Sequence, residues 1–115
     1  MAQRLFRDKE FCLRAVARNG LTLFFADESV RSDRDVVLAA VTQDGDALMF
    51  ADESFRSDRN VILAAVTQNG WALQLADENL KSDRDVVLAA VTQDGSAFRF
   101  ADESFRAIAT SSWRQ

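Results

Sequence analysis

Short blocks of apolar residues alternate with polar segments along the chain. The apolar block 36–41 follows the charged segment 33–35, and a polar turn then leads to Gly45. A second apolar block at 47–51 follows this glycine and ends at the acidic residue Asp52. Because the same succession returns several times, the pattern predicts pairs of short regular elements joined by polar turns.

The succession has a fixed period of 25 residues. The segment 33–43 returns as 58–68 and as 83–93, and a more divergent copy lies at 8–18. Self-similarity at such a period is typical of repeat proteins, so the chain contains about four copies of one structural unit. A glycine follows each copy at the same spacing: Gly20, Gly45, Gly70 and Gly95.

The first element of each copy is predicted to be a helix. Ser32 and Asp35 have the spacing of a capping box, which predicts a helix start near Asp33. The helix should run to Gln43, and Gly45 should end it by adopting a left-handed conformation.

The second element is predicted to be a shorter helix. It should begin in the block 47–51 and fray around Ser54, before the next capping residue, Ser57. Phe55 is expected to turn back into the core. The last apolar residues of the second helices share the repeat period and are expected to stack as one continuous spine: Phe50, Leu75 and Phe100.

Strands are the alternative, since the residues 36–38 favour β structure and leucine-rich repeats have similar periods. The block continues, however, into Ala39 and Ala40, which favour helices, and it lacks the leucine spacing of such repeats. Small residues here would also let adjacent backbones approach. The sequence therefore favours helices that are buried between neighbouring repeats.

The predicted fold class is all-α, a right-handed-type helical solenoid of about four 25-residue helix-turn-helix repeats. In the segment after the last repeat, Ile108 and Trp113 could fold back as a cap or stay exposed for docking. The predicted division is one α-solenoid domain over 1–115, with repeats at about 1–25, 26–50, 51–75 and 76–100 and a tail or cap at 101–115.

Composition is that of a folded protein, with 48% hydrophobic and 28% charged residues. The net charge of -4, with basic and acidic residues alternating, offers no field for nucleic acid. The longest aliphatic run, 36–41, is too short to span a membrane, and the N-terminus has charge where a signal peptide needs an apolar run. We therefore expect a soluble, intracellular protein. The single cysteine, Cys12, is expected to pack as a small hydrophobic residue.

Catalytic chemistry has little support. The sequence has no histidine, which removes the commonest general base and metal ligand. Acidic pairs such as Asp27 and Glu28 recur with the repeat period, whereas an active site is normally built once, so we interpret them as solvating the end of the second helix. Asp44 and Asp46 lack the further ligands of a calcium loop. We predict no catalytic, cofactor-binding or metal-binding residues and no enzyme activity.

Three arginines at the repeat period, Arg34, Arg59 and Arg84, are expected to form a line flanked by carboxylates from neighbouring repeats. We call this arrangement the charge ladder. Exposed ion pairs contribute little stability, so the ladder is expected to fix the register of stacking. An anion-binding stripe is the alternative, but the adjacent aspartates neutralise the arginines.

The segment 33–41, followed by Gln43, Asp44 and Gly45, resembles a repeat family known as domain of unknown function 4116. The resemblance covers roughly residues 5 to 106. It implies an α-helical tandem array and brings no activity, ligand or site residue with it. The first copy departs from the pattern, with Arg14 where the other copies have alanine, and we interpret it as adapted to an end of the array.

Positions that vary between the copies are the candidates for binding. The residue after each glycine and the residue three further on vary most, and this spacing places them on one helix face. Trp71 is the strongest candidate, because aromatic residues supply most interface hot spots. Drift on a solvent-exposed face would give the same variation. We call this set the partner stripe: Leu21, Phe24, Asp46, Met49, Trp71, Gln74, Ser96 and Arg99.

The expected function is that of a helical-repeat protein that binds a partner protein of unknown identity. The alternative is a structural subunit or spacer in a larger assembly, which forms a homo-oligomer through its repeat ends. Because the copies are highly similar, repeats of different molecules could pair as repeats within one chain do, and such self-association would favour this alternative.

Overall fold

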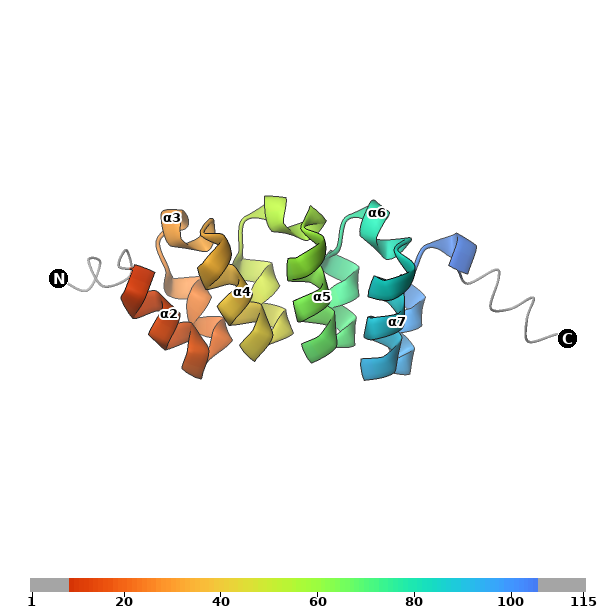
Figure 1. Ribbon diagram of the computed structural model, residues 1–115, viewed down its shortest axis with the longest axis horizontal. Coiled ribbons are helices and arrows are strands. Elements are labelled where there is room, and N and C mark those ends of the chain that lie inside the picture. Colours follow the sequence, from red (N-terminus) through yellow and green to blue (C-terminus); the bar gives the residue numbers. More distant parts are fainter. Residues whose placement is uncertain (1–8, 106–115) are drawn as a thin grey trace, which may run out of the picture.

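The computed structural model describes residues 9–105, and within this range the regular structure is entirely helical. Four α-helices of ten residues stand side by side in one row (Figure 1). They are α2 (Lys9–Arg18), α4 (Arg34–Gln43), α5 (Arg59–Gln68) and α7 (Arg84–Gln93). The prediction of an all-α repeat fold with a 25-residue period is confirmed.

A second layer of 3₁₀-helices lies behind the row of α-helices (Figure 1). Each begins at the glycine that follows an α-helix, and each has six residues. The layer consists of η1 (Gly20–Phe25), η2 (Gly45–Phe50), η4 (Gly70–Leu75) and η5 (Gly95–Phe100). The predicted second helix therefore exists, but it begins at the glycine and is wound more tightly than an α-helix.

A third short element joins each repeat to the next and was not predicted. These connectors are α3 (Glu28–Arg31), η3 (Glu53–Ser57) and α6 (Glu78–Lys81), and they lie along one edge of the array (Figure 1). The predicted fraying around Ser54 is wrong, because Asp52 caps a helical turn there by accepting a hydrogen bond from the backbone N–H of Ser54. Phe55 is buried, in agreement with the prediction.

The predicted serine caps are also wrong. Ser32 lies at the end of the connector α3, and the residue that caps α4 is Asp33, whose carboxylate accepts from the backbone N–H of Asp35. Asp58 and Asp83 do the same for α5 and α7. An aspartate is a better cap than a serine here because its charge also favours the positive end of the helix dipole.

The glycines do not adopt left-handed conformations, so the predicted stop at Gly45 is wrong in its mechanism. The residue before it, Asp44, ends α4 in an extended conformation with φ -152° and ψ 114°. Gly45 is needed for a different reason, since a Cβ atom there would collide with the carbonyl oxygen of Ala65 in the next repeat. Gly20 and Gly70 face Ala40 and Ala90 in the same way.

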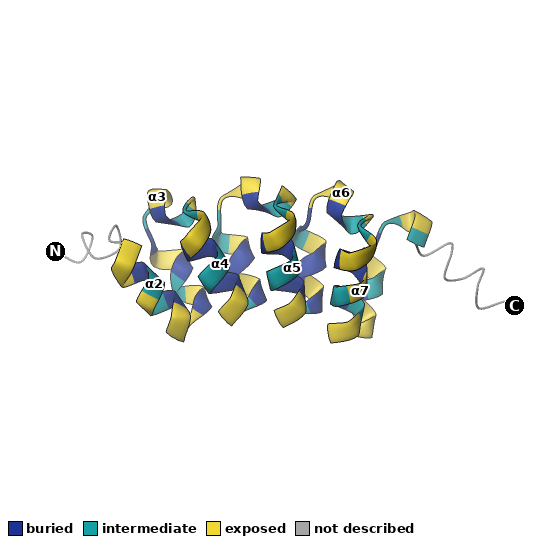
Figure 2. Cartoon of the chain, in the orientation of Figure 1, coloured by how far each residue is buried: buried dark blue, intermediate teal, exposed yellow. Residues whose placement is uncertain are grey.

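The core runs the length of the array between the two layers (Figure 2). In α4 the fully buried residues are Val36, Val37, Ala40 and Val41, and the equivalent positions of α5 are buried as well. Cys12 is buried among apolar neighbours, as predicted. The members of the predicted spine are half-buried and pack against this core: Phe50, Leu75 and Phe100.

Among the described helices, none is long and apolar enough to cross a membrane. The predictions for Ile108 and Trp113 lie outside the described residues, as does the whole of 106–115.

Candidate functional site

The partner stripe lies along the outer face of the 3₁₀ layer. With three residues per turn, residues i and i+3 of a 3₁₀-helix are aligned on one face, so each short helix presents its two variable residues together. All eight side chains are exposed: Leu21, Phe24, Asp46, Met49, Trp71, Gln74, Ser96 and Arg99. The structure therefore exposes all the varying positions, while most of the positions between them in the 3₁₀-helices are apolar and buried.

The part of the stripe on η1 and η2 is apolar except for the exposed carboxylate of Asp46. Phe24 is 55% exposed and Met49 is 56% exposed, and the neighbouring Phe25, which was not predicted as a site residue, is 64% exposed. The ring of Phe24 stands edge-on to those of Phe25 and Phe50, with centroids 5.1 and 5.0 Å apart. Edge-to-face contacts of this kind hold the aromatic surface in a defined arrangement.

The part of the stripe on η4 and η5 is more polar. The indole N–H of Trp71 donates a hydrogen bond of 2.8 Å to Ser96 Oγ, and the guanidinium of Arg99 lies 5.3 Å from the ring centroid. The ring also stands edge-on to Phe100 at 5.1 Å. Trp71 is therefore held from three sides and is only 37% exposed, less than Phe24 or Met49.

The charge ladder lies on the opposite layer, at the starts of the α-helices. Arg34 donates to Asp58 at 2.8 Å and Arg59 donates to Asp83 at 2.8 Å. Each hydrogen bond from the arginine lowers the pKa of the aspartate below its ordinary value. Arg34 and Arg59 thus pair with the capping aspartate of the following repeat, as predicted, whereas Arg84, the third predicted member, has no ion pair among the described residues. Lys9 takes the same role in the first repeat, because its ammonium lies 3.3 Å from Asp33.

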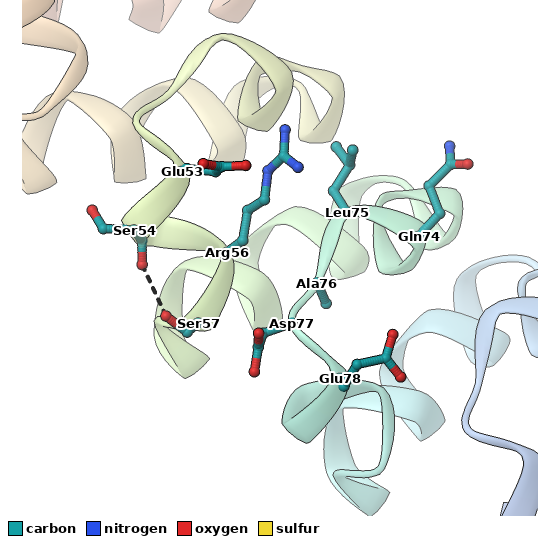
Figure 3. Close-up of a pocket in the computed structure, with 9 residues that line it drawn as sticks. All are labelled: Glu53, Ser54, Arg56, Ser57, Gln74, Leu75, Ala76, Asp77 and Glu78. Carbon is teal, nitrogen blue, oxygen red and sulfur yellow. Dashed lines mark hydrogen bonds between the residues drawn. The ribbon is translucent and has the colours of Figure 1, made fainter.

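Sequence reasoning missed a set of clefts along the connector edge. One of them, of about 520 Å³, lies between η3 and the start of α6, and Arg56 projects beside Glu53 and Leu75 there (Figure 3). A cleft of about 230 Å³ in the preceding repeat contains Arg31 at the equivalent position. The Nε atoms of both arginines are buried and make no hydrogen bond. The available signal was a basic residue that recurs near the end of each connector with the period of the repeat, and it indicates the arginines but not the clefts.

The recurring acidic pairs have a structural role in the connectors. Asp27, Asp52 and Asp77 each accept a hydrogen bond from the backbone N–H two residues further on. The interpretation that they solvate the end of the second helix is therefore wrong, since they cap the next short helix. Over residues 9–105, no group of three or more carboxylate or cysteine side chains is arranged to hold a metal ion.

Comparison with known proteins identifies a family and gives no closer relative. The model of the family described as domain of unknown function (DUF4116) matches residues 8–56 and again 58–106, each match spanning about two of the 25-residue repeats. No curated protein matches the chain, and no solved structure matches it. The two family matches together cover most of the chain. The chain therefore belongs to the family of domain of unknown function DUF4116.

Proposed function

We propose that the chain is a non-enzymatic recognition module that binds a partner protein along the partner stripe. The observation that supports this most directly is the aromatic and methionine surface formed by Phe24, Phe25 and Met49, each of which is more than half exposed. Exposed apolar side chains of this size add little to stability, and exposed apolar surface is typical of interaction sites.

The difference between the stripe on η1 and η2 and the stripe on η4 and η5 suggests how a partner would bind. Phe24 and Met49 offer the apolar centre of an interface, because burying them against a partner removes apolar surface from water. Methionine adapts its shape to the opposing surface. Trp71, held by Ser96 and Arg99, offers a rigid aromatic contact that loses little conformational entropy on binding.

A repeat scaffold suits this role because the binding side chains are separate from the core. The side chains of Leu23, Leu48 and Leu73 are fully buried beneath the layer and keep their identity in three repeats. The outer positions of the same 3₁₀-helices change without disturbing that packing. Specificity can therefore be set by outward side chains alone.

The experiment compares three forms of the full chain as immobilised bait for an extract of the source cells. The stripe variant carries Phe24→Ser and Met49→Ser, and the control carries Glu28→Ser and Glu53→Ser, which replace two exposed side chains on the connector edge. A protein retained by the wild type and the control, but lost by the stripe variant, supports the proposal.

The retained protein is then purified and its affinity is measured by calorimetry. Removing an interface hot spot typically costs about 2 kcal/mol or more, so the dissociation constant should rise by about thirtyfold. Trp71→Ala should also weaken binding. Equal binding to the wild type, the control and both stripe variants would show that the stripe is a solvent-exposed surface without this role.

A structural role in a larger assembly is the second candidate, and one observation favours it. Among the described residues, no further repeat covers α7 on the side where a neighbour covers the earlier helices, and Leu88 is 60% exposed there.

A further inference from the structure

The junction between two repeats has the same design at each of its occurrences within residues 9–105. A cation at the start of one α-helix pairs with the capping aspartate of the next, and the glycine after the helix lies against a carbonyl oxygen of the next helix. The glutamine at the end of the next helix adds a hydrogen bond. Gly70 N–H, for example, donates to Gln93 Oε1 at 2.6 Å.

The last described repeat presents one half of this junction without its counterpart. Arg84 forms no ion pair among the described residues, and a Cβ atom on Gly95 would meet nothing within 4 Å. Val91 and Phe98 are partly exposed, whereas their equivalents one repeat earlier, Val66 and Leu73, are fully buried. We call this surface the end face: Arg84, Leu88, Val91, Gly95 and Phe98.

The first described helix, α2, has part of the complementary half, while the position of the capping aspartate, Asp8, lies outside the described residues. Glu10 aligns with Asp35 and Asp85, the acids that pair with the cation of the preceding repeat. Ala15 aligns with Ala40, whose carbonyl oxygen lies against Gly20. Like α4, α5 and α7, α2 has ten residues.

α2 departs from the later helices at several positions, and two of these departures place an arginine on the helix. Arg18 stands where the other repeats have glutamine. Gln68 Nε2 donates to the carbonyl of Thr42 at 2.8 Å, a bond that an arginine can also donate. Gln43 and Gln93 instead accept from the N–H groups of Gly20 and Gly70, which an arginine cannot do, so the contact with a second copy would lack this hydrogen bond. Arg14 stands at the position of Ala39, which is only half-buried inside the array. Its stem can cover apolar surface there while the charged head stays in water.

We propose that two copies of the chain stack head to tail, with α2 of one copy seated on the end face of the other. Arg84 then pairs with Glu10 of the second copy, a carboxylate that also lies 3.5 Å from Arg14 of its own helix, and Gly95 lies against the backbone at Ala15. The contact continues the junction that already joins the repeats within one chain. It joins two different surfaces, so further copies can add in the same direction and form linear oligomers.

This inference rests on the structural role and does not involve the partner stripe. Binding of a partner at Phe24 and Met49 would leave the end face accessible, because these exposed side chains belong to η1 and η2, whereas the end face is formed by α7 and η5. A failure of one proposal therefore leaves the other standing.

The test uses sedimentation velocity of the full chain over a wide range of concentrations. Gly95→Val blocks the end face, and it should leave the fold intact because nothing lies within 4 Å of the new Cβ atom. Ala15→Glu blocks the complementary face on α2. Arg84→Glu should raise the dissociation constant of self-association about tenfold, whereas Arg99→Glu, an equal charge change on the partner stripe, should leave it unchanged.

The wild type should form oligomers that grow with concentration, and Gly95→Val and Ala15→Glu should each be monomeric alone. An equimolar mixture of these two variants retains one intact pair of surfaces, so it should form dimers and nothing larger. Formation of these dimers also shows that both variants are folded. A wild type that is monomeric throughout, or a Gly95→Val chain that still self-associates, would overturn the proposal. Self-association of Ala15→Glu alone would overturn it in favour of pairing between two end faces.

Discussion

The junctions inside the array and the end face on α7 have nearly the same sequence and different surroundings. Gly70 is buried against Ala90, whereas Gly95 is exposed. Leu63 is half-buried, whereas Leu88 is 60% exposed. Equivalent residues of different repeats can therefore contribute differently to the free energy of unfolding. The contribution depends on whether the next repeat packs against the residue.

The largest expected effect is at the glycines. Gly45→Ala places a methyl group against the carbonyl oxygen of Ala65, and the two repeats must separate to accommodate it. We expect the free energy of unfolding to fall by about 3 kcal/mol, measured by urea denaturation.

The matched control is Gly95→Ala at the end face, measured with the chain dilute enough to be monomeric. Nothing lies within 4 Å of this Cβ atom, and the backbone there is not left-handed. The substitution should leave stability unchanged or raise it by about 0.5 kcal/mol, because alanine restricts the unfolded chain. Equal losses at Gly45 and Gly95 would show that the close approach is not what these glycines provide.

The next largest effect on stability is expected at Leu63, which occupies the same position in its repeat as Leu88. Leu63→Ala removes side-chain contacts inside the array and should cost about 1 to 2 kcal/mol, below the range for a fully buried leucine. Leu88→Ala should change stability by less than about 0.5 kcal/mol, as expected of an exposed residue. Thermal unfolding of both variants measures the contrast, and similar losses would mean that α7 is covered in the monomer.

A smaller effect is expected for the charge ladder. Asp58 caps α5 and accepts from Arg34, so Asp58→Ala should cost about 1 kcal/mol in urea denaturation, mainly through the lost cap. Arg84→Ala removes a cation that has no acidic partner among the described residues, and it should leave the stability of the monomer unchanged. A loss at Arg84 equal to that at Asp58 would contradict the difference between junction and end face.

The smallest effect is a dependence on pH. Arg34 and Arg59 lower the pKa of Asp58 and Asp83 from the ordinary 3.8, so the unfolded chain binds more protons than the folded chain in that range. The stabilisation is fully present above pH 3.8 and is lost as the pH falls through the lowered values. Asp58→Asn should therefore differ from the wild type at neutral pH, and the difference should shrink in acid. A difference that grows in acid would contradict these shifts.

Much of the fold follows from the sequence because the repeat shows which positions must be equivalent. The apolar block 36–41 predicts the helix α4. The 25-residue period predicts that Arg34 lies beside a carboxylate of the next repeat, which is that of Asp58. The partner stripe was found by the same comparison, since exposed positions are free to vary. Its binding role stays a prediction.

The errors concern contacts between repeats and local hydrogen bonds. Sequence patterns associate a glycine after a helix with a left-handed stop, and only the neighbouring backbone shows that Gly45 is needed for close approach. Ser32 and Asp33 both belong to residue types that cap helices well. Because the unpredicted connector α3 ends at Arg31, Ser32 is the C-cap of α3, and Asp33 is left to cap the start of α4. The clefts at Arg31 and Arg56 arise between two connectors, so no single segment indicates them.

Hydrogen exchange of the full chain at low and high concentration tests the central contrast most directly. At low concentration, the amides of α5 should be the most protected, and those of α7 should exchange faster because α7 lacks a neighbour on its end face. At high concentration, protection should rise in α2, α7 and η5 and stay constant in α4 and α5. Equal protection of α5 and α7 at every concentration would contradict the account, because it would mean that the end face behaves as a covered junction.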